Sequence, residues 1–122
     1  MLKSSPRTGV HILGELSGCV FNDDNLLFHD RFINILAPLI ANNGLTVLDS
    51  AGHTFDDGGV TVIVALAESH VSVHTWPHDE YVTLDVFVCN HTKDNSGDAQ
   101  VLFDKVSALF TPKTSSTHLI LR

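Results

Sequence analysis

Most of the side chains that could take part in chemistry lie in one stretch, AESHVSVHTWPHDEYVTLDVFVCN, residues 67–90. Glu68 and Ser69 come first, His74 follows five residues after the serine, and Cys89 follows twenty residues after it. A serine or a thiol becomes a nucleophile when a base such as histidine lies beside it. The stretch therefore predicts nucleophilic chemistry, provided that folding brings these groups together.

Two other interpretations of the same residues stay open. In one, the serine, threonine and histidine side chains only satisfy hydrogen bonds on a half-buried sheet. In the other, His70, His74 and His78 bind a metal ion, but the segment has the pattern of a strand and no cysteine or carboxylate completes a familiar ligand spacing. We therefore expect no metal site. A Gly-x-Ser-x-Gly elbow, found in many serine hydrolases, does not surround Ser69.

The composition is that of one small acidic globular domain. A chain of 122 residues suffices for one modest core, so we expect a single domain over residues 1–122. The formal charge is -7 and the seven Lys and Arg residues are scattered, which argues against a nucleic-acid surface. No stretch reaches the roughly 18 apolar residues of a membrane span, and no secretory signal follows the first basic residues. We expect a cytoplasmic protein with free thiols at Cys19 and Cys89.

The hydrophobic pattern predicts strands and helices in the order of an α+β fold. Pro38 lies inside the first helical pattern and predicts a kink or an early end there, with Gly44 closing the segment. The elements predict a two-layer sandwich, an antiparallel β-sheet covered on one face by two helices. Strands are expected over residues 10–16, 45–50, 60–67, 71–75, 81–88 and 118–121, and helices over residues 24–41 and 98–110.

The hairpin within residues 67–90 has a predictable register. A four-residue loop makes Trp76 pair with Tyr81, and the same register, extended to the far end of the hairpin, places Cys89 beside Ser69. Ser69 and His74 are five residues apart, which in a regular strand puts their side chains on opposite faces. Bringing these two side chains together therefore requires a bend or bulge near Ser69.

The residues in this hairpin also carry a family resemblance. ESHVSVHTWP (68–77) followed by DVFVC (85–89) closely resembles the signature of the prokaryotic S-adenosylmethionine decarboxylases, pyruvoyl enzymes of polyamine synthesis. GVHILGELSGC (9–19) resembles the N-terminal strand of that family, and HTFDDGGVT (53–61) resembles the segment before its cleavage strand. The resemblance covers nearly the whole chain.

The resemblance implies that the chain makes its own cofactor. Ser69 would attack the carbonyl of Glu68, and loss of the Ser69 α-proton, assisted by His74, would cleave the chain into a β chain, residues 1–68, and an α chain, residues 69–122. The α chain would then begin with a pyruvoyl group, a ketone that forms a Schiff base with the substrate amine and withdraws electrons as CO₂ leaves.

Four further positions match the family, and the resemblance implies a role for each. Cys89 would return a proton to the substrate α-carbon. Thr61 stands where the family has a serine that assists processing, and Phe55 stands where it has an aromatic residue that stacks on adenine. Trp76 matches the tryptophan of the family signature, and we expect it to contact the substrate.

The loop of the hairpin departs from the family pattern. Where the family has a glutamate that accepts hydrogen bonds from the ribose hydroxyls, this chain has His78, which cannot make that bidentate contact. Glu80 lies two residues on, and we expect both residues to bind substrate. We expect S-adenosylmethionine as the substrate because Phe55 and Trp76 are retained. L-ornithine or L-arginine stays open, because His78 with acidic neighbours would suit a cationic amino acid, and so does an unprocessed homologue without catalytic activity.

The resemblance also implies partners. The family usually pairs its protomers so that the site forms at their interface, which implies a homodimer of processed protomers. The remaining partner would be a small-molecule amino-acid substrate, with no nucleic acid and no membrane.

Overall fold

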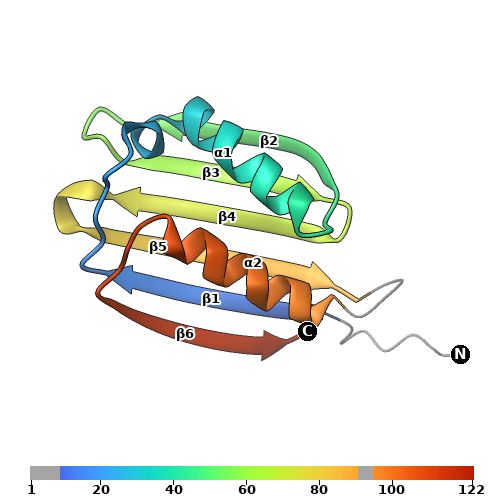
Figure 1. The fold of residues 1–122 in the computed structure, drawn as a ribbon. Coiled ribbons are helices and arrows are strands. Elements are labelled where there is room, and N and C mark those ends of the chain that lie inside the picture. Colours follow the sequence, from blue (N-terminus) through green and yellow to red (C-terminus); the bar gives the residue numbers. More distant parts are fainter. Residues whose placement is uncertain (1–8, 91–94) are drawn as a thin grey trace, which may run out of the picture.

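The computed structural model describes residues 9–90 and 95–122, which form one six-stranded sheet and two α-helices (Figure 1). The strand order is β2-β3-β4-β5-β1-β6, and every neighbouring pair is antiparallel. The strands are β1 (Gly9–Ser17), β2 (Val47–Thr54), β3 (Val60–Leu66), β4 (Ser69–Trp76), β5 (Tyr81–Cys89) and β6 (Thr114–Leu121). The α-helices are α1 (His29–Asn42) and α2 (Ser96–Ala108), and two short 3₁₀ turns are η1 (Asp24–Leu27) and η2 (Pro77–Asp79).

Both α-helices lie on the same face of the sheet (Figure 1), so the other face, the open face, has no helix over it. Alternate residues of each central strand point into the helix-covered side, because side chains in a strand alternate between faces. In β3, β4 and β5 these inward residues are mostly valines, and they are fully buried with apolar residues of both helices. The predicted two-layer α+β sandwich is confirmed.

Gly14 in β1 shows how closely α2 packs on the sheet. A Cβ added at this position would lie 2.3 Å from Cζ of Phe103, a residue of α2 that is 3% exposed. The phenyl ring therefore occupies the space that any larger residue at position 14 would need.

The hairpin of β4 and β5 has the predicted register. Trp76 pairs with Tyr81, and the pairing continues without interruption until Ser69 meets Val88, one residue from Cys89. Pro77 begins the 3₁₀ turn of the loop, and Glu80 ends it in the left-handed conformation with φ of 51°. Of the predicted bend or bulge near Ser69, the bulge is absent, because no residue is inserted in this pairing, but the backbone is distorted there, with φ of 151° at Ser69.

The first helix differs from its prediction at both ends. It begins at His29 rather than at residue 24, because Phe28 is extended and separates α1 from the preceding turn η1. Pro38 does not end the helix, which continues to Asn42 while Leu36 and Ile40, on either side of the proline, stay fully buried in the core. Gly44, with φ of 83°, follows the helix end as predicted.

The two edge strands are longer than predicted. β2 runs over Val47–Thr54 rather than residues 45–50, and β6 runs over Thr114–Leu121 rather than residues 118–121. All of β6 and most of β2 are exposed, so they lack the alternation of apolar and polar residues by which strands are recognised. None of the helices within residues 9–90 and 95–122 is long and apolar enough to cross a membrane.

Candidate active site

Ser69 begins β4 and has an unusual backbone conformation. Its φ of 151° lies in a region that residues with a Cβ rarely adopt, at a cost of about 1–3 kcal/mol. The Ser69 Oγ lies 3.2 Å from Nδ1 of His70, the next residue along the strand. Adjacent residues of a regular strand point to opposite faces, so this contact depends on the distorted backbone at Ser69.

The peptide bond between Glu68 and Ser69 is held on its carbonyl side. The backbone N–H of Cys89 donates to the Glu68 carbonyl oxygen at 2.8 Å. The Glu68 carboxylate accepts two hydrogen bonds from Thr46, one from its backbone N–H at 3.0 Å and one from its hydroxyl at 3.2 Å. The carbonyl is therefore positioned and polarised by a backbone donor, the arrangement that stabilises negative charge on an oxygen under attack.

The two cysteines are both free but have different surroundings. Cys89 is half-buried at the end of β5, next in sequence to the residue that pairs with Ser69. Cys19 is buried in the core, and burial, together with the nearby Glu80 carboxylate, raises the pKa of its thiol. The prediction of free thiols is confirmed, and Cys89 is the thiol that lies near Ser69.

A second group of predicted residues lies at the other end of β4. His74 Nδ1 is 3.0 Å from the hydroxyl oxygen of Thr61 on β3. Both side chains line a cavity of about 190 Å³, together with the aromatic residues Phe55 and Trp76, which are 48% and 41% exposed at its rim. The remaining lining residues are Asp57, Gly59, Val60 and Thr75.

Ser69 and His74 do not meet in this chain. They lie five residues apart on one continuous strand, a separation of about 16 Å at the usual rise per residue. The prediction that a serine, a histidine and a thiol converge within the hairpin is therefore wrong for His74, although it holds for Ser69 and Cys89. His78 and Glu80 are exposed in the loop beyond Trp76 and do not line the cavity.

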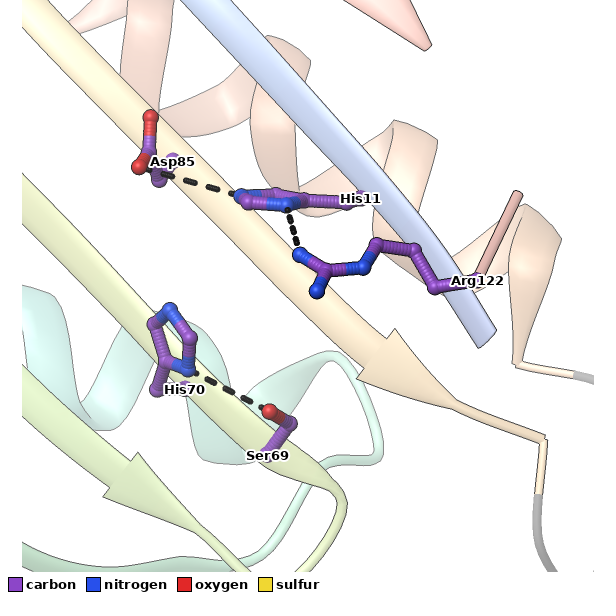
Figure 2. Close-up of polar contacts among 5 residues, drawn as sticks. All are labelled: His11, Ser69, His70, Asp85 and Arg122. Atoms are coloured by element: carbon purple, nitrogen blue, oxygen red, sulfur yellow. Dashed lines mark hydrogen bonds and ion pairs between the residues drawn. The ribbon is translucent and has the colours of Figure 1, made fainter. Parts of the chain in front are cut away.

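His70 lies beside a cluster of rings and charged side chains on the open face, and Figure 2 shows three of its members, His11, Asp85 and Arg122. The ring of His11, on β1, stacks on Phe87 of β5 at 5.1 Å between centroids, and His70 meets both rings edge-on. Arg122 Nη1 donates to His11 Nδ1 at 3.2 Å, and Asp85 Oδ2 lies 3.7 Å from His11 Nε2, beyond hydrogen-bond distance. Burial lowers the pKa of His11 and outweighs the opposing effect of Asp85.

Sequence reasoning missed several of these contacts. His11 is a polar residue among the apolar residues that begin β1, and this is a signal in the sequence. Thr46 and Arg122 carry no such signal, because their partners lie far away in sequence. Within residues 9–90 and 95–122, no three His, Cys, Asp or Glu side chains are grouped so that they could hold a metal ion.

The comparisons with known proteins agree on one family. The family model described as S-adenosylmethionine decarboxylase matches residues 10–122. The S-adenosylmethionine decarboxylase proenzyme of Clostridium botulinum (strain Loch Maree / Type A3) is 33% identical over 88 residues, which are 72% of this chain and 74% of the relative. The proenzyme of the same name from Synechococcus sp. (strain WH7803) is 37% identical over 103 residues, which are 83% of this chain and 77% of the relative.

A solved structure gives the same result for the fold. The crystal structure of the adenosylmethionine decarboxylase from Aquifex aeolicus VF5 aligns with a TM-score of 0.81 and 28% sequence identity. The alignment covers 97% of this chain and 92% of the Aquifex chain. The residues that carry the match include both strands of the hairpin that holds Ser69 and Cys89. The chain therefore belongs to the S-adenosylmethionine decarboxylase family.

Proposed function

We propose that this protein is a self-processing, pyruvoyl-dependent decarboxylase of polyamine biosynthesis that acts on S-adenosylmethionine. One observation carries the proposal: the Glu68 carbonyl accepts a hydrogen bond from Cys89 N–H, and the residue that follows it, Ser69, has a strained backbone. Strained φ values persist where the surrounding structure enforces them, and they concentrate at functional sites. The relatives named above are called proenzymes, which agrees with a chain that matures by cleavage.

Self-cleavage would begin with attack of the Ser69 hydroxyl on the Glu68 carbonyl carbon. The Cys89 N–H bonds the oxygen on which negative charge develops, and Thr46 holds the Glu68 side chain during the step. Loss of the Ser69 α-proton, assisted by His74, would then expel residues 1–68 as a carboxylate and leave an enamine at position 69, which water would convert to a ketone with release of ammonia. The pyruvoyl ketone left at position 69 supplies an electrophile for the substrate amine and an electron sink for the carboxylate carbon.

The surroundings of Ser69 fit a group of this kind. Ser69 is half-buried at the start of β4, and its hydroxyl contacts His70, so a substrate amine could reach it from the side of the sheet that carries His70. Cys89 lies one residue beyond the strand partner of Ser69 and is half-buried, a suitable position for returning a proton to the substrate α-carbon.

Completion of the site requires a second copy of the chain. Ser69 and His74 are about 16 Å apart, so His74 of the partner subunit must supply the base if it acts on Ser69. The open face offers the surface for such pairing, because it carries half-buried histidines and the exposed Ile63 without a helix over them. The partner subunit's Thr61, Phe55 and Trp76 would come with its His74, since they line one cavity. We propose a homodimer with two shared sites.

The cavity beside His74 suits an aromatic, positively charged substrate. Phe55 and Trp76 present ring faces on which an adenine can stack, and Asp57 contributes a carboxylate whose Oδ1 accepts the Gly59 N–H. S-adenosylmethionine combines an adenine with a cationic sulfonium. The Asp57 carboxylate also favours a second candidate, L-ornithine or L-arginine, whose side chains end in a cation without an adenine.

Two measurements test this function. Mass spectrometry of matured wild-type protein should give two fragments that end at Glu68 and begin at position 69, while Ser69→Ala should remain one chain near 13.3 kDa. Release of CO₂ should be strong from carboxyl-labelled S-adenosylmethionine and absent from ornithine and arginine. A wild-type chain that stays intact would contradict the proposal and indicate a non-catalytic homologue. Release of CO₂ from ornithine or arginine, but not from S-adenosylmethionine, would show that the proposed substrate is wrong.

A further inference from the structure

His70 is a titratable side chain in hydrogen-bond contact with Ser69, the residue whose peptide bond to Glu68 would be cleaved. Its Nδ1 lies 3.2 Å from the Ser69 Oγ (Figure 2), whereas His74 is bonded to Thr61 near the opposite end of the same strand. In the tautomer that carries its proton on Nε2, His70 can accept the hydroxyl proton of Ser69 directly. This contact needs no second subunit.

The ring of His70 is held in place by its neighbours. It meets His11 edge-on at 6.2 Å and Phe87 edge-on at 5.7 Å, and the Arg122 guanidinium lies over the Phe87 ring at 5.1 Å. His70, Phe87 and His11 lie on the neighbouring strands β4, β5 and β1, and Arg122 follows β6. The pairing of these strands therefore fixes the position of the His70 ring. A base positioned in this way loses little entropy when it takes a proton.

We propose that His70 is the base for the first step of self-cleavage, an inference that rests on the proposed function above. As the Ser69 Oγ bonds to the Glu68 carbonyl carbon, the hydroxyl proton passes to His70 Nδ1. The bond between that carbon and the Ser69 nitrogen then breaks, and His70 returns the proton to this nitrogen. The products are an ester at Oγ and a free Ser69 amine, so protons and electrons balance with no other reactant.

This assignment divides the work between two histidines. His70 acts within one protomer to form the ester, and His74 of the partner subunit assists the later removal of the Ser69 α-proton. Removal of either residue would make uncleaved chains accumulate, but the chains that accumulate would differ chemically: the amide would remain without His70, and the ester would remain without His74. Hydroxylamine at neutral pH cleaves esters and leaves ordinary peptide bonds intact, so it separates the two cases. A cut at Asn43-Gly44, a bond that hydroxylamine attacks at alkaline pH, would give fragments of different mass.

The experiment follows freshly made full-length chains of His70→Gln, His70→Ala, His74→Ala and wild type, with His118→Gln as a matched control on the exposed strand β6. Both His70 variants should cleave about 100-fold more slowly than wild type, the usual contribution of a positioned base. Hydroxylamine should split His74→Ala rapidly and leave His70→Gln intact. Free imidazole should accelerate cleavage of His70→Ala, which a purely structural role for the ring would not produce.

The outcomes are separable. If wild type and His118→Gln cleave and His70→Gln cleaves at the same rate, or if hydroxylamine splits His70→Gln as rapidly as His74→Ala, the assignment of His70 is overturned and the proposed function stands. If the wild-type chain itself never cleaves, the proposed function fails and this inference fails with it. Circular dichroism identifies folded variants, and His70→Gln, which keeps most of the side-chain volume, decides the result if His70→Ala does not fold.

Discussion

The separation of Ser69 and His74 along β4 makes a prediction about pairs of different subunits. Ser69→Ala removes the nucleophile and His74→Ala removes the residue that assists loss of the Ser69 α-proton, so neither variant should cleave by itself. When the two are produced in one cell, a mixed dimer contains one site with both mutations and one site with neither. We expect the His74→Ala chain of that dimer to be cleaved, using His74 of the partner subunit.

The magnitude follows from the strand geometry. Five residues at about 3.3 Å each separate the two positions by about 16 Å, several times the reach of a hydrogen bond, so the two groups of one chain cannot share a site. With equal production and random pairing, about half of the His74→Ala chains lie in mixed dimers. Cleavage should therefore approach about half of these chains and none of the Ser69→Ala chains.

Intact-mass spectrometry measures this directly, because the two variants and their fragments differ in mass. Co-production of His74→Ala with the double variant Ser69→Ala, His74→Ala is the matched control, since its mixed dimers contain no complete site. An uncleaved His74→Ala chain in the first mixture, with mixed dimers present, would refute the shared site. Cleavage in the control mixture would show that His74 is not needed.

Three further predictions concern the fold and its ionisable groups. Gly14→Ala should lower the free energy of unfolding by about 1–3 kcal/mol in a denaturant titration, because the new Cβ would overlap the Phe103 ring; Gly97→Ala, with nothing within 4 Å, should not. Burial lowers the pKa of His11 below the ordinary value of about 6.5, so the unfolded state binds the proton more readily and stability falls as pH drops below that value. Between pH 7 and pH 5, roughly the range over which histidine titrates, the denaturant concentration at the midpoint of unfolding should therefore fall less for His11→Phe than for wild type. Equal decreases in the two proteins would contradict this. Cys19, which is 1% exposed and has a thiol pKa raised by burial, should resist iodoacetamide in the folded protein and react after unfolding, as mass spectrometry can check.

The hairpin could be predicted in detail because its pattern is local. Valines on one face and polar residues on the other determine which side is buried, and a short loop then sets Trp76 opposite Tyr81 and Ser69 beside Val88. The order of strands in the sheet was not predictable in the same way. β1 lies between β5 and β6, contacts that join the beginning of the described chain to its end.

The candidate site could be predicted only in part. The residue types of Ser69, His74 and Cys89 suggested one cluster, but a strand extends by a fixed rise per residue and keeps His74 away from the other two. The contact of Ser69 with His70 could not be read from alternation, because it depends on a φ of 151° at Ser69. The cavity around Phe55 and Trp76 needed the loop before β3 and the end of β4 to meet in space.

The strand order also decides what a cut between Glu68 and Ser69 would do to the molecule. Residues 1–68 contribute β1, which lies between β5 and β6 of the other piece, while β3 pairs with β4 across the break (Figure 1). The two fragments would therefore remain associated after cleavage, because their strands pair with one another within one sheet. Once unfolded, however, they would have to find each other by diffusion. Recovery of the native protein would then depend on its concentration, as in an obligate heterodimer, whereas the uncut chain can refold alone.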